Sequence, residues 1–422
     1  MRKLAPVILF SVLPVLLLSF SPRYAGVGDS LFNDITPCQG TSLEPDARMV
    51  AAQIFFIEGS SPAEIEEYLK GMNQDGINTI LLRVFQNQGD RPHPLASDNL
   101  LPGVYFQTDQ APVICDLLSP VVEVAHRHNI KVFAWMSTRH CDWQLQRNRG
   151  WRDIRFDPRS HRLEEGEFLD LFNPEVVDYL VHLYRDLAHH SIDGIVFQDD
   201  LISRSTEGYS PSARRLYFQN FGKSLQPDRM YITKGDKLSY SPDFWQWVAW
   251  KSQYLLSLAD TLRKTCREVN PALQFAVNIY YDTLYDPRNA LAWLSQDLSS
   301  LLSSNFDYYF VMSYHRQMRR ELSLSQLQTL SLLADITEQL DREFPQRSKV
   351  VMKLQTKDWT TGKPIPFAEL SDVLQIFLRN SKAGIALVPY TKDSTSSQLL
   401  RSIKRRRERE ENIFPARVRT QK

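Results

Sequence analysis

The segment SIDGIVFQDDL, residues 191–201, decides the fold. Its centre, residues 192–198, is a short run rich in apolar side chains, which is typical of a strand buried on both faces. The run ends at two adjacent acids, Asp199 and Asp200. Because parallel strands are covered by helices and functional groups gather where such strands end, the segment predicts a parallel α/β core with a polar site beyond residue 198.

Runs of this kind recur along the chain and alternate with amphipathic segments of helical period. The expected strands cover residues 51–57, 78–85, 131–137, 192–198, 274–280, 308–313, 349–354 and 384–390. The expected helices cover residues 61–74, 111–128, 174–190, 243–269, 323–342 and 367–380. Eight expected strands that alternate with helices favour a (β/α)8 TIM barrel over a doubly wound sheet. The doubly wound sheet is further disfavoured because no glycine-rich dinucleotide motif follows a strand. The long segments 86–110, 138–172 and 201–242 predict enlarged loops after the second, third and fourth strands.

Composition and the start of the chain limit the class of protein. A net charge of +1 over 422 residues gives no global field toward nucleic acid or anionic lipid, so neither is an expected partner. Residues 1–28 combine a basic start, an interrupted apolar run and small residues, which predicts an export signal and a periplasmic or secreted protein with no membrane span after cleavage. An uncleaved anchor is the alternative. We expect an extension over residues 29–47, the barrel over 48–410 and a tail over 411–422.

The cysteines do not form a disulfide scaffold, because the chain has only four, at positions 38, 115, 141 and 266. A single bridge between Cys115 and Cys141 is one interpretation, and buried free thiols are the other. With no CxxC motif and no paired-histidine motif, the sequence predicts no metal site, and it points to no cofactor.

Alternation along the fourth strand orients the two acids. If bulky Ile195 and Phe197 face the helices, Gln198 and Asp200 face the barrel interior and Asp199 lies on the opposite face or at the rim. A carboxyl group at the mouth, with a pKa raised by aromatic surroundings and a neighbouring charge, suits general acid catalysis on a glycosidic oxygen. Asp200 is therefore the expected proton donor. The alternative is that both acids cap the next helix or form surface ion pairs.

Aromatic and acidic side chains follow several other expected strands. Sugar rings stack on aromatic rings, so this arrangement suits a polysaccharide groove, although any one ring could belong to the core instead. The aromatic candidates are Trp135, Trp143, Tyr280, Tyr314, Trp359 and Tyr390. The candidates for a second catalytic group are Glu58, Asp142, Asp282 and Asp358, with Glu58 and Asp282 ranked first; the substrate's own acetamido group is the alternative.

Four segments carry a family resemblance: GVYFQTDQAPVICDLLSPVVEVAHRHNIKVFAWM (103–136), LAHHSIDGIVFQDDL (187–201), VNIYYDTLYDP (277–287) and VMKLQTKDW (351–359). They resemble the family 153 glycoside hydrolases, the C-terminal domains of PgaB proteins. The resemblance covers residues 48–400 and implies an endo-acting barrel hydrolase of partly de-N-acetylated poly-β-1,6-N-acetylglucosamine, a biofilm polymer. It also implies that the Asp199 and Asp200 pair acts in catalysis, and that Trp135, Asn278 and Tyr314 line the groove.

Two departures from that family bear on partners and substrate. PgaB proteins carry an N-terminal deacetylase domain, which is not expected here, so a separate deacetylase or polymer export machinery is an expected partner. Lys353 and Arg316 stand where the family favours acids, so either the two sequences align one residue differently here or the protein prefers a less cationic glycan. Two other functions stay open: a non-catalytic barrel that binds and guides the polymer during export, and a hydrolase of a different exopolysaccharide.

Overall fold

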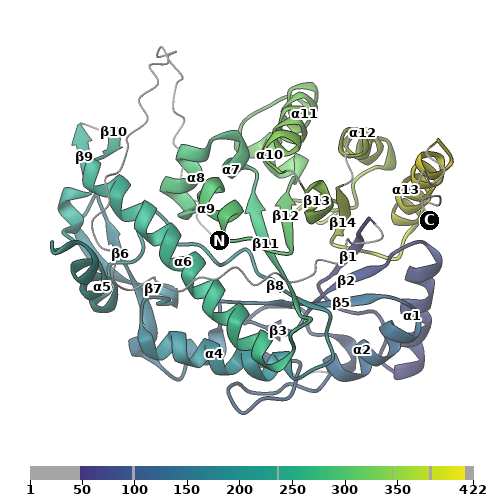
Figure 1. Ribbon diagram of the computed structural model, residues 1–422, viewed down its shortest axis with the longest axis horizontal. Coiled ribbons are helices and arrows are strands. Elements are labelled where there is room, and N and C mark those ends of the chain that lie inside the picture. The colour runs from purple at the N-terminus through teal and green to yellow at the C-terminus, as the bar shows by residue number, and fades with distance from the viewer. Residues whose placement is uncertain (1–47, 97–99, 235–236, 345, 380–382, 414–422) are drawn as a thin grey trace, which may run out of the picture. The chain divides into compact units, whose positions relative to one another are not determined.

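The computed structural model describes residues 48–413 except 97–99, 235–236, 345 and 380–382. Eight parallel strands form a closed barrel in the order β1-β14-β13-β12-β11-β8-β5-β2 (Figure 1). They are β1 Val50–Ile54, β2 Thr79–Arg83, β5 Lys131–Met136, β8 Gly194–Phe197, β11 Gln274–Tyr280, β12 Tyr308–Met312, β13 Val350–Gln355 and β14 Gly384–Val388. The first and last strands close the ring by pairing Val50 with Ile385. The expected (β/α)8 TIM barrel is confirmed.

Helices cover the outside of this ring (Figure 1). The long ones are α1 Pro62–Gln74, α2 Leu118–Arg127, α4 Pro174–Ala188, α6 Pro242–Val269, α11 Gln326–Glu343, α12 Phe367–Leu378 and α13 Ser394–Ile413. Helices α1, α4 and α6 each begin with a serine or asparagine cap followed by proline. The cap side chain accepts a hydrogen bond from a backbone amide of the first turn, and proline has no amide hydrogen that would lack a partner there. The helix expected from residue 111 begins only at Leu118, because residues before it pair with the β4 segment, as in the bridge from Val104 to Val113.

Enlarged loops follow β2, β5 and β8, as expected from the sequence. Each contains an antiparallel pair: β3 Phe85–Gln86 with β4 Gly103–Val104, β6 Arg152–Asp157 with β7 Arg162–Leu169, and β9 Tyr231–Lys234 with β10 Lys237–Tyr240. The shorter helices are α3 Asp142–Leu145, α5 Pro211–Phe221, α7 Asp282–Tyr285, α8 Pro287–Leu294, α9 Leu298–Ser303 and α10 His315–Glu321. Since these loops leave the carboxyl ends of their strands, they surround the mouth of the barrel.

The barrel interior is filled by small and aromatic side chains from alternate strand positions. Val196 belongs to this inner cluster, whereas Ile195 and Phe197 pack with the surrounding helices, so the alternation expected for β8 holds as far as residue 197. Gly194 is required at the start of β8, because a Cβ atom there would lie 2.3 Å from a ring carbon of Phe133 inside the barrel.

Of the two interpretations of the cysteines, the structure supports free thiols: Cys115 and Cys141 form no bridge, and Cys266 is free as well. Cys141 is fully buried at the N-cap of α3, and the Cys266 thiol donates to the carbonyl oxygen of Tyr184 at 3.3 Å, so these two behave as core side chains. Cys38, the expected export signal, the extension to residue 47 and the tail beyond residue 413 lie outside the described residues. Within the described part of the chain, no helix has the length and apolar character needed to cross a bilayer.

Candidate active site

The carboxyl ends of β8, β11 and β13 meet around Asp199. Strand β8 ends at Phe197, and the residues after it form a turn, so the alternation of the strand does not extend to the acids. The carboxyl group of Asp199 interacts electrostatically with the inward-facing Lys353 and with Tyr314. The hydroxyl of Tyr280 donates to the backbone oxygen of Asp199 at 2.8 Å. Asp199, which is half-buried, therefore faces the mouth of the barrel.

Asp200 turns away from the mouth, which corrects the orientation expected from the sequence. Its carboxylate accepts hydrogen bonds from the hydroxyls of Ser137 and Thr138, both at 2.7 Å. The backbone amides of Thr138, Arg139 and His140 donate to it at 3.0, 2.8 and 2.9 Å. The side chain is 9% exposed. Asp200 therefore holds the loop after β5 against the turn after β8, because its oxygens are already occupied by donors from that loop.

Burial raises the pKa of the Asp199 carboxyl, the positive charge of Lys353 opposes this shift, and the negative charge of Asp200 reinforces it. Burial in turn lowers the pKa of Lys353 to about 8, although Asp199 acts against that shift. The Lys353 ammonium donates to Oδ1 of Asn278 at 2.6 Å, and Nδ2 of Asn278 donates to the carbonyl of Phe197 at 2.8 Å. These contacts tie β13, β11 and β8 together beneath Asp199.

An aromatic wall continues from Trp135 around the mouth. The ring of Phe55, just beyond β1, lies 5.1 Å from that of Trp135 and 6.5 Å from that of Trp359, onto which it stacks. The ring of Tyr314 meets Trp359 edge-on at 5.7 Å. Trp135, Tyr314 and Trp359, all expected at the groove, are therefore brought together, and Phe55 is the ring that connects them.

Three buried polar atoms at this end of the barrel have no hydrogen-bond partner among the described residues. They are Oε1 of Gln53, Nε1 of Trp135 and Oε1 of Gln198. Buried polar groups are nearly always paired, so an unpaired donor and two unpaired acceptors beside an aromatic wall suit a ligand with hydroxyl and amide groups.

Three of the residues expected at the groove lie elsewhere, which corrects those predictions. Trp143 is 2% exposed in the core, where its Nε1 donates to the hydroxyl of Tyr179 at 2.8 Å. Tyr390 packs outward, with its ring 6.2 Å from that of Tyr68 on α1. Glu58 is exposed and interacts electrostatically with the same two tyrosines rather than with Asp199. These three residues follow strands in the sequence, as the residues of the mouth do, so their sequence positions alone did not separate the two groups.

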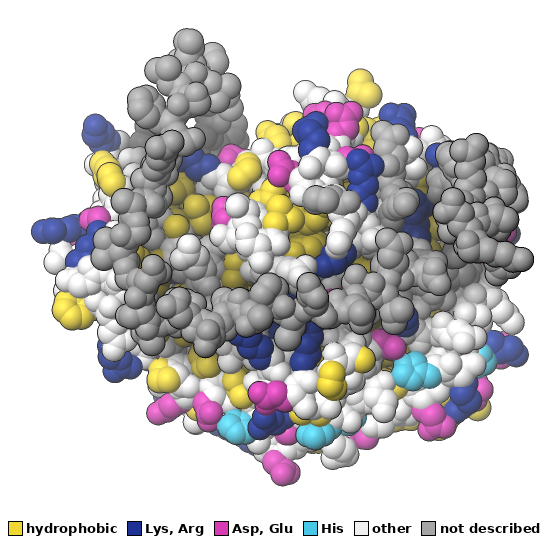
Figure 2. Space-filling view, in the orientation of Figure 1, with side chains coloured by type: hydrophobic (Ala, Val, Ile, Leu, Met, Phe, Trp, Pro, Cys, Tyr) yellow, Lys and Arg dark blue, Asp and Glu magenta, His cyan; other side chains and the backbone are white. Residues whose placement is uncertain are grey.

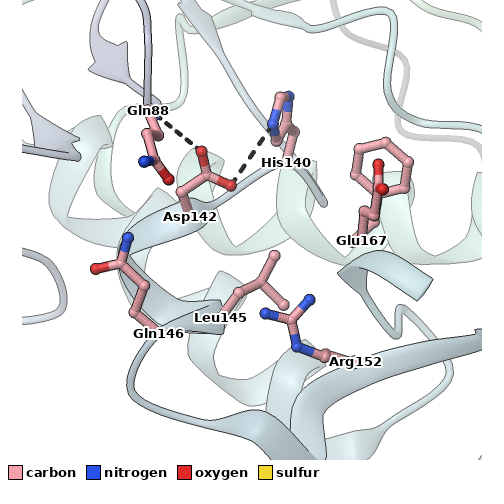
Figure 3. A pocket seen from close by; sticks show the side chains of 8 residues that line it. Gln88, His140, Asp142, Leu145, Gln146, Arg152 and Glu167 are labelled. Carbon is pink, nitrogen blue, oxygen red and sulfur yellow. Dashed lines mark hydrogen bonds and ion pairs between the residues drawn. The ribbon is translucent and has the colours of Figure 1, made fainter. Parts of the chain in front are cut away.

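Asp142 lies in a separate cavity of about 310 Å³ between the loops after β2 and β5 (Figure 3). Its carboxylate accepts from the backbone amide of Gln88 at 2.8 Å and lies 3.6 Å from Nε2 of His140. Glu167 and Arg152 also line this cavity, and Asp199 does not. The structure therefore separates Asp142 from the barrel mouth.

The last two candidate acids also have other partners. Burial and the neighbouring Glu321 raise the pKa of Asp282 to about 6, at the start of α7. Asp358 pairs with Arg316, which donates to it at 2.8 Å, and this bond lowers the pKa of Asp358. Arg316 also binds Glu369 at 2.6 Å. The arginine that departs from the family pattern is thus neutralised by two carboxylates.

Gln53 and Phe55 also lie at the mouth, although neither was predicted as a site residue. The signal was present in the AAQIF segment, because inward positions of β1 alternate and Gln53 is the first polar one. Lys353 was predicted only to affect the choice of glycan, although its positive charge also lowers the pKa of Asp199.

The model of the hypothetical glycosyl hydrolase family 13 matches residues 60–390, which contain the aromatic wall from Trp135 onward and both acids after β8. The chain belongs to that family. This makes the protein a glycoside hydrolase by family membership, and the barrel mouth described above is its candidate active site. No curated protein sequence matches this chain.

Solved structures with the same fold are also glycoside hydrolases. The PgaB (BpsB) glycoside hydrolase domain from Bordetella bronchiseptica is 21% identical with a TM-score of 0.65, over 84% of this chain and 98% of that one. The catalytic domain of β-amylase from Paenibacillus polymyxa is 11% identical with a TM-score of 0.56, over 84% and 98%. The β-galactosidase of Marinomonas ef1 is 9% identical with a TM-score of 0.59, over 87% of this chain and 60% of that one. At these identities the likeness establishes the fold, and the resemblance to PgaB stands.

Proposed function

We propose that this protein is an exported hydrolase of partly de-N-acetylated poly-β-1,6-N-acetylglucosamine or a closely related amino-sugar polymer, with Asp199 as its proton donor. The observation that carries the proposal is the half-buried carboxyl group of Asp199, which has a raised pKa and faces a barrel mouth lined by aromatic rings. A general acid must hold its proton at working pH, and a raised pKa extends the pH range in which it does so.

The hydrogen bonds of Asp200 favour this division of roles between the two acids. A carboxylate that already accepts from Ser137, Thr138, Arg139 and His140 would have to lose those bonds to reach a glycosidic oxygen. We therefore propose that Asp200 positions its neighbour and supplies the adjacent negative charge that helps to raise the pKa of Asp199.

The substrate's own acetamido group is the proposed nucleophile. Two carboxyl groups about 5–10 Å apart on either side of the bond are the usual arrangement in glycoside hydrolases. Here Asp142 lines another cavity, Asp358 is paired with Arg316, and Asp282 lies beside Glu321. An N-acetylated sugar at the cleavage site fits this arrangement, and it also avoids placing a free sugar ammonium next to Lys353.

The likeness to the PgaB domain and the signal-like residues 1–28 support the proposed polymer, compartment and partners. Aromatic rings and unpaired amide and indole groups suit a chain of acetylated sugars. We propose a periplasmic or secreted location in a biofilm polymer system, where a separate deacetylase or the export machinery supplies the polymer.

The test compares Asp199→Asn with Asp200→Asn on partly de-N-acetylated polymer, with products followed by mass spectrometry. For Asp199→Asn we expect a fall in turnover of roughly 10²–10⁴-fold with an unchanged melting temperature, because a proton donor is lost and no packing changes. For Asp200→Asn we expect a loss of about 2–4 kcal/mol in unfolding free energy, because its amide hydrogens would face other donors.

Three outcomes would count against parts of this proposal. Full activity of Asp199→Asn removes the assigned donor. A stable but inactive Asp200→Asn, beside an active Asp199→Asn, would exchange the two roles. Tight binding of the polymer by the unmodified protein without cleavage would favour the barrel that guides polymer during export.

A further inference from the structure

A cavity of about 400 Å³ opens beside the aromatic wall, between α10 and the loop after β13. Trp359 lines this cavity and also stacks on Phe55 at the mouth, so the same ring borders both spaces. Gln355, the last residue of β13, lines it as well. A polymer bound along the wall would therefore place a neighbouring sugar at this cavity.

The charges that line the cavity do not cancel. Arg316 is fully engaged, because it donates to Glu369 at 2.8 and 2.6 Å and to Asp358 at 2.8 Å. Asp358 also accepts from the backbone amides of Thr360 and Thr361 at 2.8 and 3.1 Å. Asp358, the one acid among the described residues that line this cavity, therefore has its oxygens occupied by Arg316 and by backbone amides, and it forms no ion pair with Arg319 or Arg320.

Arg319 and Arg320 remain as cations that line the cavity. Arg320 donates to the hydroxyl of Thr360, which is a neutral partner. Within the described part of the chain, neither arginine forms an ion pair with a carboxylate. Arginine presents a planar fork of donors that matches a carboxylate or phosphate, so this pair is an unused recognition element for an anion.

We propose that this cavity binds an anionic substituent of the polysaccharide, such as an acyl chain ending in a carboxylate, a phosphate ester or a uronic acid. The inference rests on the proposed function and names its substrate more narrowly: an amino-sugar polymer that carries acidic groups near the cleaved bond. An ammonium-bearing sugar is disfavoured here because Arg319 and Arg320 would repel it.

The test uses one partly de-N-acetylated polymer whose free amines are left free, capped with acetic anhydride, or capped with succinic anhydride. Chain length is then the same in three probes that are cationic, neutral and anionic. Binding to the inactive Asp199→Asn protein is measured by calorimetry, and cleavage by the unmodified protein is measured in parallel. We expect the succinyl-capped polymer to bind roughly tenfold more tightly than the acetyl-capped one.

The variant carrying Arg319→Gln and Arg320→Gln should bring the ratio of succinyl to acetyl affinity to about one. The control carries Arg401→Gln and Arg405→Gln, which remove two exposed arginines on α13 and so change the charge by the same amount, and it should leave that ratio unchanged. Equal affinity of the unmodified protein for the succinyl and acetyl probes, or a preference that survives the double variant, overturns the inference. Absence of cleavage with an arginine-dependent binding preference would instead overturn the proposed function and leave the anion site standing.

Discussion

The ammonium group of Lys353 controls the charge state of Asp199 more than any other cation. It lies inside the barrel on β13, fully buried, and its positive charge favours the ionised form of the Asp199 carboxyl. Asp200 acts in the opposite direction, and the uncharged hydroxyls of Tyr280 and Tyr314 complete the surroundings. Burial is the main cause of the raised pKa of Asp199, and Lys353 is a cation that opposes this shift and can be replaced without touching the aromatic wall.

Lys353→Met should move the descending limb of the pH dependence of kcat/KM to higher pH. The sign follows from the charge: without the cation, the pKa of Asp199 rises, so the acid stays protonated and active at higher pH. Lys349→Met is the matched control, because Lys349 precedes β13 at the opposite end of the barrel. A limb that stays in place in Lys353→Met, or moves equally in Lys349→Met, would contradict the assignment of Asp199.

At the scale of elements, α6 secures the enlarged loop after β8. Lys251 on this helix is fully buried, and burial lowers its pKa to about 7. Its ammonium donates to the hydroxyl of Ser203 at 3.1 Å and to the carbonyls of Arg204 and Glu207 at 2.7 and 3.1 Å. The side chain of Glu207 in turn pairs with Arg139 at 2.6 Å, in the loop after β5 that also binds Asp200. The two loops beside the active site are thus joined through one buried polar network.

Lys251→Met should lower the unfolding free energy by about 2–4 kcal/mol, because buried carbonyls lose their donor. Lys264→Met, which removes an exposed lysine paired with Asp260 on the same helix, should cost no more than about 0.5 kcal/mol. Urea denaturation measures both. Equal effects of the two substitutions would show that the network does not stabilise the loop.

For the whole molecule, the sequence predicted the barrel because strand and helix signals are local and repeat along the chain. The boundaries of β11 agree at both ends, and every expected strand is present. The site was only partly predictable, because the direction of a side chain beyond a strand depends on where the strand stops. Because β8 ends at Phe197 and a turn follows, Asp199 rather than Asp200 faces the mouth. Trp143 and Tyr390 also follow strands, but Trp143 lies in the core and Tyr390 packs against α1.

Removal of residues 1–28 should leave the barrel intact, because the first strand begins at Val50 and pairs with β2 and β14 within the described residues. We expect N-terminal sequencing of the exported protein to begin near residue 29. A chain of residues 29–422 should unfold at the same urea concentration as the full chain, since it keeps every strand pair of the described residues. Recovery of the protein from membranes with Met1 in place would favour an uncleaved anchor, and the proposed hydrolase would then act while tethered to the bilayer.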